Sequence, residues 1–234
     1  MHPRKLFLNL CTWTSLALLL TPVIGSAGQK PKEWNPVIEP SDFVSFVDNP
    51  YFPLTPGTTY RYADKTGTET LVIEVTGRTK TIMGVRTIVV IETGAENGQT
   101  VEISENWFAQ DRDGNVWYFG ESTQDFVNGS PGSTAGSWEA GVNGAQPGII
   151  MKGQPQPGDT YFQEHAPGVA EDMATVQQVG LVENTALRAF TSVIKTKEWN
   201  PLESGGVEFK YYASGIGLIR EAKGNTGLEL VSMN

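Results

Sequence analysis

Residues 105–122, with the sequence ENWFAQDRDGNVWYFGES, decide the fold class of this chain. Two runs of large aromatic residues, Trp107-Phe108 and Trp117-Tyr118-Phe119, flank a turn sequence at 111–115. An Asp-Gly pair between two β-forming runs is typical of a β-hairpin. Because side chains alternate between the two faces of a strand, neighbouring rings in each run must point to opposite faces. The segment therefore predicts a hairpin that carries aromatic rings on both faces.

Strand-like patterns extend along most of the chain on both sides of this hairpin. Apolar residues alternate with polar ones, and Gly-, Asn- and Pro-rich breaks separate the runs. Such a series predicts an all-β fold, an antiparallel meander that forms a barrel or a two-layer sandwich. Strands and helices do not alternate regularly, so a dinucleotide-binding sheet is excluded. The other predicted strands lie near 58–62, 71–75, 85–91, 101–109, 159–164, 173–182, 188–197, 207–212, 216–223 and 228–232.

Residues 1–27 have the features of a secretory signal peptide. A short basic region precedes an apolar stretch, and the small residues 25–27 form a cleavage site. The apolar stretch is broken at Pro22 and is shorter than the roughly 20 residues that a membrane span needs. We therefore expect cleavage, a secreted or periplasmic location, and no membrane span in the mature chain.

The remaining chain divides into two parts. Residues 28–57 form an extended, Pro-rich lead-in, and residues 58–234 form a single all-β domain. The lead-in is predicted to contain one short N-terminal helix, with Ser41 as its N-cap and an end before Pro50.

Cleavage would also remove Cys11, the one cysteine of the chain. The mature chain would then lack disulfides, thiolate nucleophiles and cysteine-bound metals. Because residues 1–27 carry two basic residues and no acidic ones, the net charge would change from −9 to −11. Such a charge disfavours nucleic acid and anionic membranes as partners. A neutral or cationic small molecule, a polysaccharide or a metal ion is allowed.

Side chains suited to catalysis are few. His165 is the one histidine outside the signal peptide, and no Gly-x-Ser-x-Gly motif accompanies it, so a catalytic triad is not indicated. Glu164, Glu171 and Asp172 lie close together around a Pro-Gly turn. Such carboxylates could serve a hydrolase or lyase that acts on an extracellular polymer, or could bind calcium. They could equally form an acidic, solvated turn.

The hairpin turn at 111–115 has a partial likeness to a calcium-binding loop. Its glycine stands at the fourth rather than the sixth loop position, and Ser122 occupies the twelfth, where an EF-hand has Glu. We interpret it as a turn in which Asp111 or Asn115 bonds the backbone. No metal ligands are predicted here, and calcium is the one cofactor left open.

The aromatic residues favour a third kind of function, a non-catalytic binding protein. The rings on one face of the hairpin must contact something other than the main core. The Gly/Pro-rich segment 120–158 is the first candidate for this contact. We predict that Trp117, Tyr118 and Trp138 contact a ligand with an apolar or sugar-like surface. Cross-strand packing is the alternative explanation for the rings. A divalent-metal-binding accessory module is a further hypothesis.

Four segments resemble those of a group of exported bacterial proteins. They are NPYFPLTPGTTYRY at 49–62, DRDGNVWYFGES at 111–122, SWEAGVNGAQPGIIM at 137–151 and YYASGIGLIRE at 211–221. The resemblance covers most of the mature chain. It implies export and a single β-rich domain, and it implies no activity, ligand or catalytic residue.

Overall fold

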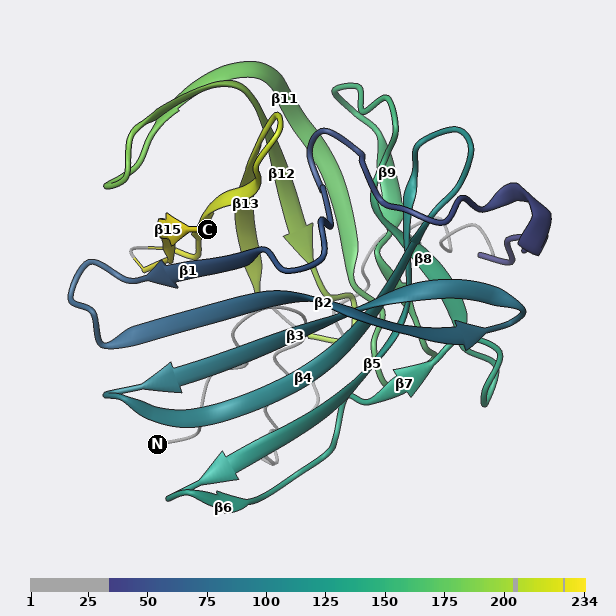
Figure 1. Cartoon of the computed structure of the whole chain (residues 1–234), viewed down its shortest axis with the longest axis horizontal. Helices are drawn as coiled ribbons and strands as arrows, with labels where there is room; N and C mark the ends of the chain where they lie inside the picture. Colours follow the sequence, from purple (N-terminus) through teal and green to yellow (C-terminus); the bar gives the residue numbers. More distant parts are fainter. Residues whose placement is uncertain (1–33, 204–205, 225) are drawn as a thin grey trace, which may run out of the picture.

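The computed structural model describes residues 34–203, 206–224 and 226–234. The predicted signal peptide and Cys11 lie outside these residues. The described chain forms fifteen β-strands in one antiparallel sheet (Figure 1), which confirms the predicted all-β class. The strands are β1 (Thr59–Ala63), β2 (Glu69–Ile82), β3 (Val85–Glu96), β4 (Gln99–Gln110), β5 (Val116–Val127), β6 (Ser130–Pro131), β7 (Trp138–Glu139), β8 (Gln146–Met151), β9 (Thr160–Phe162), β10 (Glu164–His165), β11 (Met173–Asn184), β12 (Ala189–Trp199), β13 (Val207–Ala213), β14 (Gly217–Ala222) and β15 (Glu229–Met233).

The sheet consists of two meanders that meet on both sides. Strands β1 to β5 form the first and β11 to β15 the second, and they join where β1 pairs with β15. On the other side, β8 and β10 extend the first meander and β9 extends the second. Gln163 alone separates β9 from β10, so the two ends of the sheet meet in one short piece of chain. The sheet is therefore nearly closed into a barrel (Figure 1) rather than folded as a sandwich.

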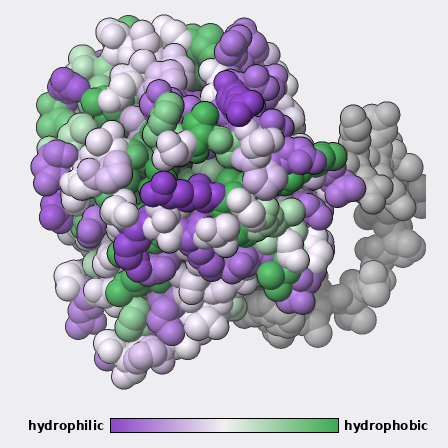
Figure 2. All heavy atoms as spheres, turned by 45° about the vertical axis from the view of Figure 1, so that its right-hand side comes forward, coloured by the Kyte–Doolittle hydropathy of each residue, from purple (hydrophilic) through white to green (hydrophobic). Residues whose placement is uncertain are grey.

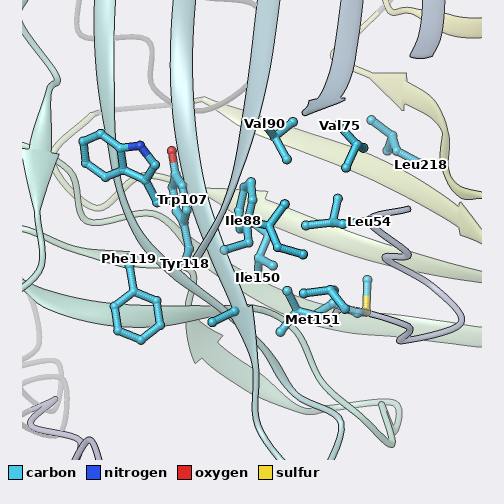
Figure 3. Close-up of a cluster of buried hydrophobic side chains, with 14 of the residues drawn as sticks. Leu54, Val75, Ile88, Val90, Trp107, Tyr118, Phe119, Ile150, Met151 and Leu218 are labelled. Carbon is cyan, nitrogen blue, oxygen red and sulfur yellow. The ribbon is translucent and has the colours of Figure 1, made fainter. Parts of the chain in front are cut away.

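Side chains from both meanders fill the interior. Leu71 and Val75 from β2, Tyr118 from β5 and Leu230 from β15 are almost fully buried in one cluster. The lead-in contributes Leu54 to the same cluster, part of which Figure 3 shows. Apolar burial thus unites the two meanders and the lead-in.

The predicted short N-terminal helix is not formed. Pro40–Asp42 make a single 3-10 turn, and Phe43 then forms an extended bridge with Asp111. The Val44 N–H donates to the carbonyl of Gln110 at 2.9 Å. These bonds to the end of the hairpin satisfy the backbone and outweigh the weak local preference for a helix.

The predicted hairpin is formed by β4 and β5, and Asp111 organises its turn. The Asp111 carboxylate accepts hydrogen bonds from the backbone N–H and the side-chain amide of Asn115, each at 2.8 Å. It also accepts one from the indole N–H of Trp117 at 2.8 Å. The turn therefore fixes the orientation of the first ring that follows it.

The rings of the hairpin lie on both faces, as strand alternation predicts. Phe108 and Tyr118 stack in the interior, with ring centroids 4.7 Å apart. Trp107 and Phe119 lie to the other side, away from Leu54 (Figure 3). Trp107 and Phe119 are nevertheless buried. Other parts of the chain must therefore cover the outer face of the hairpin.

The remaining surface is mixed. On the face shown in Figure 2, hydrophobic residues lie in small groups among hydrophilic ones. The most exposed large hydrophobic side chains, Val37, Val127 and Val182, come from separate parts of the chain. Within the described residues, the structure has no helix of sufficient length and hydrophobicity to cross a membrane.

Candidate functional site

The strand β7 lies beside the hairpin and extends the sheet next to β5. It pairs with β5, with Glu139 opposite Gly120 and Trp138 opposite Glu121. Gly120 has a φ of 130°, and a Cβ at this position would lie 2.3 Å from the carbonyl oxygen of Trp138. Glycine is therefore required for this close approach of the two strands.

An open cleft of about 570 Å³, here called the tryptophan cleft, lies beside β7. Its volume falls within the range of known ligand pockets, about 300–1,000 Å³. Trp107 and Trp138 line it from two different strands. The other lining residues are Lys80, Glu105, Glu121, Ser122, Ser137, Glu139, Val142, Asn143, Ala145, Ala166, Pro167 and Val169. The cleft thus combines two aromatic side chains with charged and hydroxyl-bearing groups.

Three strands bring charges and a ring together in this cleft. The Lys80 ammonium of β2 lies 3.3 Å from the centroid of the Trp107 ring. The same ammonium lies 2.7 Å from a carboxylate oxygen of Glu139 in β7. The Lys80 and Glu139 side chains are 35% and 36% exposed, so solvent reaches the pair.

Several polar groups beside the cleft lack partners. The indole N–H groups of Trp107 and Trp138 and the hydroxyl of Thr123 are buried, with no hydrogen-bond partner in the described part of the chain. A buried polar group without a partner costs about 1–3 kcal/mol. Oxygen atoms that reached these donors would therefore be stabilised.

The structure places the three predicted ligand-contact residues differently. Trp138 lines the tryptophan cleft. Tyr118 lies in the interior, where its hydroxyl donates to Asn106 at 2.5 Å and its ring meets that of Trp138 edge-on at 5.4 Å. Trp117 is partly buried and packs against Trp34 at 6.3 Å, and it does not line the cleft.

Two residues of the cleft did not stand out as site residues in the sequence. Strand alternation places Trp107 on the opposite face from Phe108, and this signal could have identified it. Lys80 gave no such signal, because its position depends on a shift of register in β2 between Val75 and Thr79.

A second cluster of charged groups lies inside the barrel around Lys210. The Lys210 ammonium lies 2.9 Å from Glu198 and 3.5 Å from Glu208. Glu221 stands opposite Lys210 on the neighbouring strand β14. Glu198 also accepts a hydrogen bond from the buried hydroxyl of Tyr212 at 3.2 Å. Several carboxyl groups therefore share one buried ammonium.

Burial and neighbouring charges shift the pKa values of these groups. Burial raises the pKa of Glu92 to about 8, although the Lys210 ammonium lowers it. Burial also raises the pKa of Asp172 to about 7 and that of Glu221 well above its usual range. Burial is the largest single influence and lowers the pKa of Lys210, but Glu198, Glu208, Tyr212 and Glu221 together outweigh it, so the pKa stands well above its usual value. Burial therefore favours the protonated forms of Glu92, Asp172 and Glu221 in the interior.

A small cavity of about 50 Å³ adjoins Glu92 and Lys210. Apolar side chains such as Phe52 and Leu218 form most of its lining. A volume of this size accommodates a few water molecules rather than a ligand of ordinary size. The interior cluster is therefore a weaker candidate for a binding site than the tryptophan cleft.

The predicted carboxylate residues are divided between the interior and the surface. Glu164 is fully buried, and its N–H donates to the Asp172 carbonyl at 3.2 Å. The Asp172 carboxyl is enclosed beside the Lys210 cluster, although the residue as a whole is half-buried. Glu171 instead accepts a bond from the N–H of Gly168 at 3.0 Å and stabilises the turn. None of the three carboxylates lines the tryptophan cleft.

The described residues offer no evident metal site. They include no group of three or more His, Cys, Asp or Glu side chains placed to hold a metal ion. Both oxygens of Asp111 are already engaged within the hairpin turn. Calcium binding therefore stays a hypothesis that no arrangement of these side chains tests.

No family model and no curated protein matches this chain. Two solved structures are similar to it. One is of a Bacteroides fragilis protein described provisionally as exported, with a YmcC-like fold; it is 18% identical, with a TM-score of 0.45. The other is of a Parabacteroides distasonis protein described provisionally as a lipoprotein; it is 13% identical, with a TM-score of 0.42. Each comparison covers 79% of this chain and 98% of the other. The fold given above rests on the strand pairing of this chain.

Proposed function

We propose that the mature chain is an exported, non-catalytic binding protein whose ligand occupies the tryptophan cleft. The observation that carries this proposal is the meeting of Trp107 and Trp138, from separate strands, in one open cleft of about 570 Å³. Aromatic side chains provide flat apolar surfaces on which a sugar ring can stack. Secretion or a periplasmic location would follow from the signal peptide.

The lining of the cleft limits the class of ligand. Three carboxylates, Glu105, Glu121 and Glu139, share the cleft with Lys80. Glu105 is paired with Arg78 at 2.7 Å and Glu139 with Lys80, so the carboxylates exceed these cations by one, and such a balance disfavours anionic ligands. The hydroxyls of Ser122 and Ser137 offer hydrogen bonds to a polar ligand. The cleft therefore favours a neutral, hydroxyl-rich or cationic molecule, such as a small molecule or a segment of a polysaccharide.

A cleft-blocking variant tests this proposal. The exposed residue Ser122 lines the cleft, so Ser122→Trp should fill it without disturbing the core. The control is Val182→Trp, which places the same bulky side chain on an exposed position of β11. We expect ligands identified by a thermal-shift screen of neutral glycans and amines to bind the wild type and the control, and Ser122→Trp to lose at least tenfold in affinity by calorimetry. Equal binding by all three proteins, or no binding by the wild type, would contradict the proposal.

A second candidate function is a carboxylate-based hydrolase or lyase that acts on an extracellular polymer. It is favoured by one observation, the pKa of Asp172, which burial raises to about 7, and it requires the enclosed carboxyl to become accessible to the polymer. Product release from polysaccharides, measured by reducing ends, should then disappear in Asp172→Asn. Absence of product release by the wild type would remove this candidate.

A further inference from the structure

The tryptophan cleft already holds one bound cation, which belongs to the protein itself. The Lys80 ammonium lies over the Trp107 ring at 3.3 Å and contacts the Glu139 carboxylate at 2.7 Å. A cation between an aromatic face and a carboxylate is an arrangement by which proteins recognise ammonium ligands.

This arrangement differs from the other cation–ring contacts of the described residues. Lys195 lies over Phe209 at 4.2 Å, and Arg220 lies over Tyr211 at 5.1 Å. In neither pair do the cation and the ring line the same one of the cavities described above. For Lys80 and Trp107, both members line the same open cleft.

The internal cation can leave at low cost. An ion pair and a cation–ring contact at a solvent-accessible position each contribute little to stability. Lys80 and Glu139 are each about one-third exposed, and Lys80 has a flexible stem that can swing into solvent. The ring and the carboxylate would then be available to another cation.

We propose that the ligand of the tryptophan cleft carries an ammonium group, which takes the place of Lys80 between Trp107 and Glu139. This inference rests on the proposed binding function and specifies its ligand as an amine or a quaternary ammonium compound. Lys80 acts in it as an internal competitor that occupies the cation position until the ligand arrives. The acidic lining of the cleft suits a cation, and the hydroxyls of Ser122 and Ser137 can bond hydroxyl groups that the ligand also carries.

The probes are choline and its uncharged analogue 3,3-dimethyl-1-butanol. Binding to the wild type and to Lys80→Met is measured by calorimetry and by tryptophan fluorescence. Lys80→Met removes the competing charge and retains an unbranched apolar stem, and Lys80→Gln serves as a second variant. Lys65→Met is the matched control, because Lys65 is exposed and lies outside the cleft.

We expect choline to bind both Lys80 variants at least tenfold more tightly than it binds the wild type or Lys65→Met. The uncharged analogue should show no such gain. Equal choline affinity in all four proteins would overturn the proposal, as would equal gains for choline and the uncharged analogue. If neutral glycans still bind the wild type and Ser122→Trp abolishes that binding, the tryptophan cleft remains the binding site and only the ammonium proposal fails.

Discussion

The ammonium of Lys210 lies 2.9 Å from the carboxylate of Glu198, and both side chains are almost wholly buried. They come from the adjacent strands β12 and β13, and both project into the interior of the barrel. Charges so deeply buried are retained only when each has a partner. The stability of the second meander therefore depends on the presence of both charges of this pair.

Lys210→Met should destabilise the protein strongly, because it leaves the buried Glu198 carboxylate without its counter-charge. We expect a loss of about 3–5 kcal/mol in the free energy of unfolding, measured by denaturant titration at pH 7. The double variant Lys210→Met, Glu198→Leu should recover much of this loss, because it removes both charges. A loss below about 1 kcal/mol in the single variant would show that the pair contributes little.

Stability should fall as the pH rises from about 4.5 to 8. Burial raises the pKa of Glu92 from 4.5 to about 8, so the folded protein keeps a proton that the unfolded chain releases in this interval. Asp172 acts in the same direction up to about pH 7. Glu92→Gln should therefore weaken this dependence and exceed the wild type in denaturation midpoint at pH 8. Parallel pH profiles for the two proteins would contradict the assigned role of Glu92.

Gly120→Ala should damage the tryptophan cleft and lower stability. The new Cβ would lie 2.3 Å from the Trp138 carbonyl oxygen, so β7 would have to move. The matched control is Gly129→Ala, which also has a positive φ, 77°, but no heavy atom within 4 Å of the new Cβ. We expect Gly120→Ala to lose more stability than the control, by at least about 1 kcal/mol, and to shift tryptophan fluorescence. Equal losses would mean that the close approach of β7 does not matter.

Asp111→Ala should loosen the hairpin turn, because it removes the acceptor for Asn115 and for the Trp117 indole. Hydrogen bonds to a charged group contribute about 1.5–3 kcal/mol each, and partial exposure will reduce their sum. We expect a loss of about 1–3 kcal/mol in unfolding experiments, with a change in tryptophan emission. Asp113→Ala, at an exposed position of the same turn, should stay within about 0.5 kcal/mol of the wild type.

Local sequence patterns predict most strands of this fold, because alternation and turn residues act over a few residues. The strand predicted at 173–182 is β11, and the Asp-Gly turn leads directly into β5. The helix predicted near Ser41 fails because contacts with Gln110 and Asp111, distant in sequence, determine its conformation.

The candidate site is less predictable than the strands. Segment 120–158 and Trp138 were identified from composition, since a large aromatic residue within a Gly-rich segment needs burial or a partner. The contact of Lys80 with the Trp107 ring could not be identified in this way, because only the register of β2 brings Lys80 to that ring. The sequence did not predict the interior carboxyl cluster for a similar reason. Strand pairing sets Glu221 opposite Lys210, and spacing along the chain does not reveal that pairing.

The pairing of β1 with β15 joins segments that lie far apart in the sequence, and such contacts are slow to form. Each meander can assemble from hairpins between neighbouring segments, whereas this seam unites Tyr60 with Met233. Until it closes, β1 presents an unpaired edge, and exposed edges promote aggregation between chains. A chain that lacked β15 would keep this edge open permanently. Strand β15 therefore protects β1 from edge-to-edge association.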